Sequence, residues 1–265
     1  MLCDILHNTL IFHICQHYFL LVLCDILSVI IRMGFLNLEL QLENAKNAKI
    51  NRTFIKDEVY DKLSNWIITG YLEPETKINI NDLSISLGTS RTPVREAILK
   101  LENEGLIISK ANRWTIVAPI DLDSSYYTYS VVASLEMLAL EQSFDKIDDI
   151  FIEELEIINA KLDLAFKKSD TMELLNCDNE FHDKFIYLSG NPELPAIIHP
   201  LKKKIQRVEL SFFKDNDGKS NTFKEHRKLI EALKNKDLEL AKQCIKANWY
   251  NSISLVIEKQ KNKNK

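Results

Sequence analysis

After residue 53, apolar positions recur mostly at the spacing of α-helices. In the stretch FIKDEVYDKLSNWIITGYL, residues 54–72, the side chains of Ile55, Val59 and Leu63 fall on one helical face. Gly70 then supplies a residue that readily adopts the left-handed conformation with which many helices end. The pattern predicts a first helix whose apolar face needs a partner.

Two shorter helices are predicted next, with a glycine turn between them. Asn79 is suited to cap the first helix, which Gly88 ends, and Ser90 is suited to cap the second. Pro93 falls in the first turn of that helix, where a missing N–H costs little. The buried stripe of this helix is predicted to consist of Val94, Ile98 and Leu101. Helix, tight turn and helix form the helix-turn-helix pattern.

The pattern changes to that of β-strands after Gly105. The runs LIISK and RWTIVA, residues 106–110 and 113–118, are rich in β-branched and aromatic residues. Ala-Asn joins them, and Asn112 tolerates the positive φ of a tight turn. We therefore expect a hairpin, and with it a winged helix-turn-helix domain over residues 54–118.

From residue 119 onward the chain shows no strand pattern. Roughly six amphipathic segments follow one another with short connections, which predicts an antiparallel α-helical bundle over residues 119–258. The segments are Ser124–Phe144, Lys146–Lys168, Asp170–Leu188, Pro192–Phe213, Asn221–Lys234 and Asp237–Glu258. A tail rich in Lys and Asn ends the chain at residues 259–265. The predicted fold class is mainly α, with a small β-hairpin wing in the first domain.

Residues 1–53 read as an apolar extension followed by a polar linker. The run at residues 10–31 is apolar enough for a membrane helix, although Asp25 inside it costs roughly 2.5–3.5 kcal/mol on insertion scales. The acidic start lacks the positive charge and cleavage site of a secretory signal. Three interpretations stay open: an extension upstream of a native start at Met33 or a poorly ordered tail, a membrane anchor, and a helix packed on the rest.

Composition narrows the classes of function. The formal net charge of -4 excludes a generally basic coat for nucleic acid, so phosphate contacts would come from a local cluster. The five cysteines are scattered and show no Cys-x-x-Cys spacing, which argues against a disulfide framework and a thiolate zinc site. A reducing cytoplasm is the location that fits this cysteine usage.

The second helix of the helix-turn-helix carries Arg91 and Arg95 in its first turns, where the helix dipole disfavours cations. Docking of this helix in the major groove of DNA would supply the compensating anion. The residues predicted to contact bases or phosphates are Ser90, Arg91, Thr92, Arg95, Lys110 and Arg113. The alternative is that both arginines lie on a solvated face and pair with Glu96 or Glu102.

The stretch GTSRTPVREAILKLENEGLI, residues 88–107, resembles the signature of the GntR family of bacterial transcription regulators. The resemblance covers the three helices and the wing. It implies a homodimer on a two-fold operator, with DNA contacts at the Ser90, Arg91, Thr92 and Arg95 positions. Two departures leave the operator sequence open, because Asn81 and Asn112 stand where the family usually has Arg and Gly. We count both as candidate DNA contacts.

Candidate metal ligands are concentrated in CDNEFHDKF, residues 177–185. Asp178 and His182 are spaced i, i+4 and therefore share a helix face, which suits one metal ion. Further ligands must come from other helices, and His226 and Asn248 are the candidates, with His199 a weaker one. By itself the pair is a weak signal, better explained by an ion pair on a solvated face or by a packed core histidine.

The larger domain resembles the all-helical effector domain of the FadR-type subgroup of the same family. The resemblance implies a divalent metal at Asp178, His182 and His226, with Asn248 where the family has a further histidine. An amide oxygen is a weaker ligand than imidazole, so zinc, nickel and manganese all stay candidates. The resemblance also implies a small organic acid as effector, and Arg207 is the candidate cation for its carboxylate.

Three classes of function stay open. The first is a cytoplasmic DNA-binding regulator, a repressor that a small organic acid releases from operator DNA. The second is a membrane-tethered form of the same regulator, anchored by residues 10–31. The third is a metal-dependent enzyme, against which the attached DNA-binding domain and the lack of an evident nucleophile or general base argue. We therefore expect a regulator and no enzyme.

Overall fold

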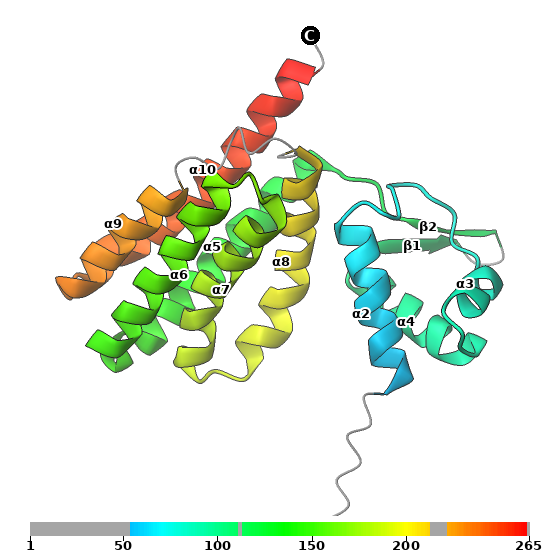
Figure 1. Ribbon diagram of the computed structural model, residues 1–265, viewed down its shortest axis with the longest axis horizontal. Helices are drawn as coiled ribbons and strands as arrows, with labels where there is room; N and C mark the ends of the chain where they lie inside the picture. Colours follow the sequence, from blue (N-terminus) through cyan, green and yellow to red (C-terminus); the bar gives the residue numbers. More distant parts are fainter. Residues whose placement is uncertain (1–53, 111–112, 213–221, 264–265) are drawn as a thin grey trace, which may run out of the picture. The chain divides into compact units, whose positions relative to one another are not determined.

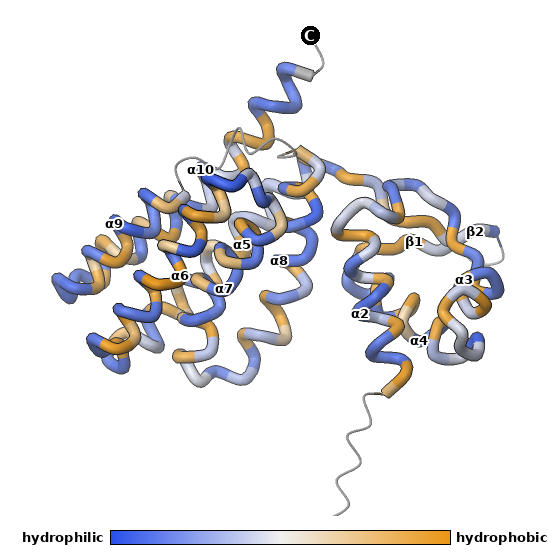
Figure 2. Tube along the Cα trace, in the orientation of Figure 1, coloured by the Kyte–Doolittle hydropathy of each residue, from blue (hydrophilic) through white to orange (hydrophobic). Residues whose placement is uncertain are grey.

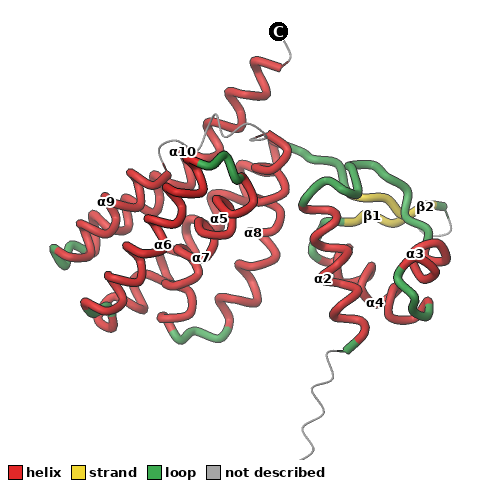
Figure 3. The backbone as a smooth tube through the Cα atoms, viewed as in Figure 1, coloured by secondary structure: helices red, strands yellow, loops and turns green. Residues whose placement is uncertain are grey.

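The computed structural model describes residues 54–110, 113–212 and 222–263 (Figure 1). The expected extension and linker at residues 1–53 lie outside the described residues, as does Asn112. Helices make up most of the described chain, with one antiparallel strand pair (Figure 3). The predicted class, mainly α with a small β-hairpin, is confirmed.

The first part of the described chain contains the helices and strands of a winged helix-turn-helix. Its elements are α2 (Ile55–Ile68), α3 (Ile80–Ser86), α4 (Arg91–Asn103), β1 (Ile107–Lys110) and β2 (Trp114–Val117). The strands pair in antiparallel register from Ile107 opposite Val117 to Lys110 opposite Trp114. The buried stripes of α2 and α4 face each other across one apolar core, which the wing closes through Leu106, Ile107 and Val117. Because one face of α4 packs into this core, the opposite face of the helix is exposed to solvent.

The ends of the short helices follow the local chemistry with one exception. The Asn79 side chain caps α3 by accepting from the Asn81 N–H at 2.9 Å, and Gly88 leaves the helix at φ 62°. The expectation that the Ser90 side chain caps α4 is wrong. Ser90 holds the N-cap position, but its hydroxyl makes no capping bond. Pro93 occupies the third helical position, so one of the two N–H groups that a cap would use is missing.

The second part of the described chain is a helical bundle. Its elements are α5 (Leu122–Ser143), a short 3-10 turn η1 (Phe144–Lys146), α6 (Asp149–Lys167), α7 (Thr171–Ser189), α8 (Glu193–Phe212), α9 (Thr222–Lys234) and α10 (Leu238–Lys263). The last helix continues beyond Glu258, where the sequence pattern predicted its end. Residues 259–263 contain Lys, Gln and Asn but no Gly or Pro, and Lys and Gln are good helix formers.

The bundle packs around α5 and α7. Helix α5 contacts α7, α8 and α10, while α6 contacts α7 and α9, and α9 contacts α10. Hydrophobic and hydrophilic positions are interspersed along the helices of the bundle (Figure 2). The largest buried side chains of this core include Tyr129, Phe181 and Phe185. Within the described ranges, no helix is both long and apolar enough to cross a membrane.

Helix α4 offers a matched test of its predicted buried face. The Leu101 side chain is fully buried, whereas Leu99 on the same helix is 57% exposed. Replacing Leu101 with Ala is expected to cost about 2–5 kcal/mol of unfolding free energy, because it removes buried apolar surface and leaves a cavity. Leu99→Ala is the control and should change the free energy by less than about 1 kcal/mol. Urea denaturation of both variants measures the difference; equal costs would contradict the orientation of α4.

Candidate functional site

A basic groove lies on the winged domain, where α3, α4 and the wing meet. It has a volume of about 760 Å³. Its charged lining residues are Lys77, Arg91, Arg95, Lys110 and Arg113, and none of its described lining residues is acidic. The chain is acidic overall, so this groove is a local concentration of positive charge on the element expected to enter DNA.

The arginines of this groove are exposed, and neither Arg91 nor Arg95 forms an ion pair within the described residues. The carboxylates that the alternative interpretation assigned to them have other partners. Glu96 lies 4.0 Å from Lys56, and Glu102 accepts a hydrogen bond from the Ser109 N–H at 3.2 Å. The positive charge at the start of α4 therefore remains available to an external anion.

The other candidate DNA contacts divide into three groups. Asn81 lines the groove, Ser90 and Thr92 are exposed at the start of α4, and Asn112 lies outside the described residues. Several lining residues were not predicted from the sequence as DNA contacts, among them Lys77 and Trp114. Trp114 is 40% exposed. Its position next to Arg113 in the sequence could have marked it as a candidate DNA contact. The place of Lys77 depends on its backbone bridge to Ile116, which spacing alone does not show.

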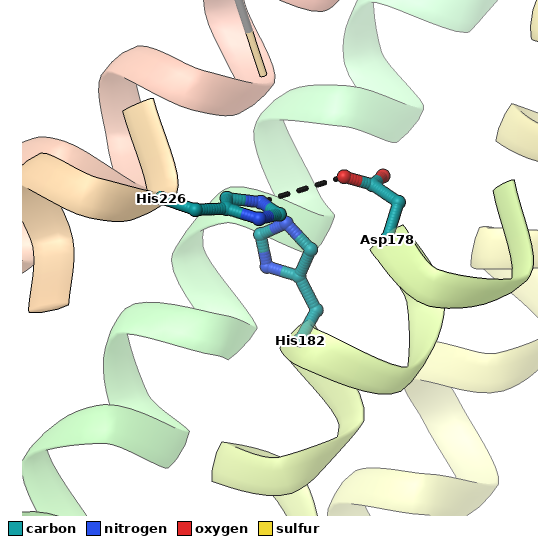
Figure 4. Close-up of side chains that lie close together, drawn as sticks. All are labelled: Asp178, His182 and His226. Atoms are coloured by element: carbon teal, nitrogen blue, oxygen red, sulfur yellow. Dashed lines mark ion pairs between the residues drawn. The ribbon is translucent and has the colours of Figure 1, made fainter. Parts of the chain in front are cut away.

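A second candidate site lies inside the bundle. Asp178 and His182 project from α7 toward His226 on α9 (Figure 4). One ligand atom from each residue lies within 4.8 Å of the others, and all three residues are buried. His226 Nε2 is 3.4 Å from Asp178 Oδ1. The sequence predicted these three residues as a set, and the structure brings them together.

The two imidazole rings are held by aromatic neighbours. The His226 ring stacks on Phe181 with centroids 3.8 Å apart and planes 4° from parallel. The His182 ring lies against Trp249, with centroids 4.9 Å apart. Packing on both rings restricts their rotation, so the nitrogen atoms are presented in fixed directions.

His182 has a buried carboxylate partner on α5. Its Nδ1 lies 2.7 Å from Glu136 Oε2, and the same oxygen accepts from Trp249 Nε1–H at 2.7 Å. Burial alone would lower the pKa of His182, but the Glu136 carboxylate outweighs it and the pKa is raised. Burial would likewise raise the pKa of Glu136, yet His182, Lys202 and Trp249 together bring it below its usual value. The sequence did not single out Glu136 as a partner of the cluster.

The residues of the cluster fit a divalent transition metal. One carboxylate and two imidazoles form a donor set that zinc, nickel and manganese accept. With Nδ1 of His182 directed at Glu136, Nε2 is the nitrogen left for a metal, and it is buried without a hydrogen-bond partner among the described residues. A buried imidazole nitrogen of this kind is costly unless something binds it.

The remaining candidates lie on α8 and α10. Asn248 is buried on α10, and its Nδ2–H donates to Glu225 Oε2 at 2.8 Å, which leaves Oδ1 as its ligand atom. His199 is on α8, with Nε2 3.7 Å from Asp183 Oδ1. Arg207 is buried on α8 and donates to the Ala118 carbonyl, and burial lowers its pKa to about 10. Its predicted role in holding an effector stays a prediction.

A basic winged helix-turn-helix joined to a helical second domain defines a DNA-binding transcriptional regulator. Residues 55–117 match the family model described as bacterial regulatory proteins, gntR family, and residues 127–249 match that of the FCD domain. The chain belongs to the GntR family, with an FCD domain as its helical part. The resemblance seen in the sequence is thereby confirmed.

Known proteins support the same assignment. YdhC of Bacillus subtilis (strain 168), an uncharacterized HTH-type transcriptional regulator, is 26% identical over 196 residues, which cover 72% of this chain and 86% of YdhC. McbR of Escherichia coli (strain K12), also an HTH-type transcriptional regulator, is 25% identical over 224 residues, which cover 79% of this chain and 96% of McbR. The solved structure of E. coli McbR/YncC shares the fold, with a TM-score of 0.69 at 21% identity over 78% of this chain and 99% of that one.

These relatives and folds are transcriptional regulators and not enzymes, so the expectation of a regulator is confirmed and the enzyme alternative is dropped. The GntR helix-turn-helix implies DNA binding, and an FCD domain usually binds a small-molecule effector.

Proposed function

We propose that this protein is a repressor that binds two-fold operator DNA as a homodimer and leaves it when a small organic acid binds the helical domain at a divalent metal. The observation that carries the DNA part is the groove whose five cations face no acidic lining residue. Closed two-fold symmetry is the usual arrangement for reading a palindromic operator with one helix per half-site. Because bacterial DNA lies in the cytoplasm, the proposal places this regulator there as well.

In this proposal α4 enters the major groove. Arg91 and Arg95 reach guanine edges or phosphates, while Ser90, Thr92 and Asn81 hydrogen-bond nearby oxygens. The wing holds the adjacent backbone through Lys110 and Arg113, and Asn112, which lies outside the described residues, stays a candidate contact. The exposed cations release counterions from DNA on binding, which is the source of affinity for any sequence.

In the bundle, Asp178, His182 and His226 would hold the metal, and the Asn248 amide oxygen is the proposed fourth ligand. A bound divalent metal supplies a positive centre for the carboxylate of a small acid. Asp178 contributes the one negative charge of the ligand set, and Phe181 and Trp249 fix the two imidazoles from the apolar side. Zinc, nickel and manganese stay the candidates.

Two contacts of α8 support communication between the domains. Arg207 donates to the Ala118 carbonyl, which follows β2, and Lys203 Nζ lies 2.6 Å from the Tyr60 hydroxyl on α2. The same helix bears Lys202, which reaches the polar groups around His182. If binding of the acid moves α8, the contacts between α8 and the winged domain change as well. Binding in the bundle and binding to DNA would then be coupled through two conformations of the protein.

Replacing Arg95 with Ala tests the DNA part of the proposal. If Arg95 reads a base, the variant should bind an operator selected from random duplexes about 1–3 kcal/mol more weakly. Arg227→Ala removes an equally exposed arginine from α9 and is the control. Fluorescence anisotropy at one fixed salt concentration measures both; equal affinity of the Arg95 variant and wild type would refute its role.

Metal content tests the buried cluster. Protein purified without chelators should carry roughly one divalent transition metal per chain, as a single site requires. Asp178→Ala and His182→Ala should lose it, because each removes a buried ligand, whereas His199→Ala should keep it. Elemental analysis by mass spectrometry gives the answer. A metal-free wild type, or a His199 variant that loses metal like the others, would exclude this cluster as the site.

A thermal-shift screen tests the effector. Small mono- and dicarboxylic acids should raise the melting temperature of the metal-loaded protein, because a ligand that binds only the folded state stabilises it. The same acids should have a much smaller effect after the metal is removed. An acid that stabilises the protein should also lower its affinity for operator DNA in an anisotropy titration. Tighter DNA binding with the acid would reverse the repressor assignment.

A further inference from the structure

Two buried charges lie beside the metal-ligand cluster without belonging to it. Glu136 on α5 has no exposed surface, and Lys202 on α8 is only 5% exposed. Glutamate and lysine are seldom buried to this degree unless they are paired. Both residues lie on helices other than those that carry Asp178, His182 and His226.

The contacts of these residues form a chain that ends at His182. Lys202 Nζ lies 2.6 Å from Asp183 Oδ1 and donates to the Asn179 carbonyl at 3.3 Å. It also lies 3.9 Å from Glu136 Oε1. The other oxygen of Glu136 lies 2.7 Å from His182 Nδ1 and accepts from the Trp249 indole N–H. The Glu136 carboxylate is therefore held from three directions.

This arrangement determines which nitrogen of His182 faces the cluster. A neutral imidazole donates from one nitrogen and offers a lone pair on the other. A carboxylate at Nδ1 places the hydrogen there and leaves the lone pair on Nε2, which lacks a partner among the described residues. In metal sites, a carboxylate behind a histidine orients the ring and strengthens the ligand.

Lys202 contributes a countercharge to that carboxylate, beside the shorter contact that Glu136 makes with His182. A buried carboxylate without a countercharge is strongly unfavourable, and neutral hydrogen-bond donors alone do not offset the lost hydration. The Trp249 indole supplies direction but no charge. Lys202 supplies the charge, and its bonds to α7 tie that charge to the helix that bears His182.

We propose that Glu136 is a positioning residue for the metal site, directing Nε2 of His182 at the metal, and that Lys202 is the countercharge that keeps Glu136 in place. The inference rests on the proposed metal function and adds two residues to it. A purely structural ion pair between α5 and α8 is the competing explanation. If the pair is purely structural, removing it should lower the stability of the fold and leave the affinity for metal unchanged.

A double variant separates the two explanations. Glu136→Leu together with Lys202→Met removes both charges at once, and apolar replacement of a whole buried pair is often neutral for stability. The matched control is Glu156→Gln with Lys234→Met, which removes an exposed ion pair of 2.7 Å elsewhere in the bundle. Zinc affinity is measured by competition with a chromophoric chelator, and melting temperature by circular dichroism.

The double variant is expected to melt near the wild-type temperature and to bind zinc about 10–100-fold more weakly, the usual cost of losing a residue behind a metal ligand. Cobalt(II) in place of zinc should show altered visible absorption bands in this variant and unchanged bands in the control. A folded double variant with wild-type zinc affinity and cobalt spectrum would overturn the positioning role. A wild type that binds no zinc, cobalt or nickel would instead overturn the metal function itself.

The tautomer of His182 gives a measurement that needs no variant. In metal-free wild type, at a pH high enough for the His182 imidazole to be neutral, ¹⁵N NMR of labelled histidine should show its single proton on Nδ1. A neutral ring with its proton on Nε2 would overturn the inference even if the double variant failed to fold. Glu136→Gln, which keeps an acceptor oxygen but removes the charge, should retain this tautomer and bind zinc with an affinity between those of wild type and the double variant.

Discussion

Burial of charge in the helical bundle is the constraint on which the rest of the site depends. Asp178, His182, His226, Glu136 and Lys202 are all nearly or fully enclosed by a core of aromatic and aliphatic side chains. In such a medium each charge must meet an opposite charge or a hydrogen-bond donor. Four helices, α5, α7, α8 and α9, contribute to this polar cluster, so its geometry depends on their mutual packing.

The winged domain shows the opposite arrangement. The cations that line its groove stand at the surface and form no ion pair within the described chain, while Glu96 lies near Lys56 and Glu102 accepts from the Ser109 N–H. Charges that are buried and paired stabilise one internal geometry, whereas charges that are exposed and unpaired attract an external anion over a distance set by the salt. The two halves of the chain thus use charge for different purposes.

The sequence predicted the fold class because helical spacing is a local property. The wing was equally visible, since Ile107, Ile108 and Trp114 lie in short β-branched and aromatic runs on either side of a turn. The Asp178–His182 pair followed from i, i+4 spacing, and His226 was a candidate from another helix that the resemblance to a known family then supported. Spacing alone favoured an ordinary ion pair or a packed core histidine.

What the sequence did not show depends on contacts between distant residues. Glu136 and Lys202 meet only because α5 packs against α8, and no local pattern marks either of them as a partner of His182. The missing cap at Ser90 has a different cause, because Pro93 removes a donor that the general preference for serine assumes. The bond from the Arg207 guanidinium to the Ala118 carbonyl likewise joins residues far apart in the sequence, and the role of Arg207 toward an effector stays a prediction.

In the proposed ligand set, the surroundings of Asn248 would compensate for its weakness as a ligand. Its Nδ2–H donates to Glu225 Oε2, and the other oxygen of Glu225 accepts from Asn251 at 2.7 Å. Donation to a carboxylate draws electron density toward the amide oxygen, so that Oδ1 becomes a better acceptor than an unbonded amide. The same bond restricts rotation of the side chain and lowers the entropy lost when Oδ1 binds. Glu225 is thus the hydrogen-bond partner of Asn248 on the side away from the proposed metal, as Glu136 is for His182. An amide still carries no charge, and the net charge of the ligand set is therefore fixed by Asp178 alone.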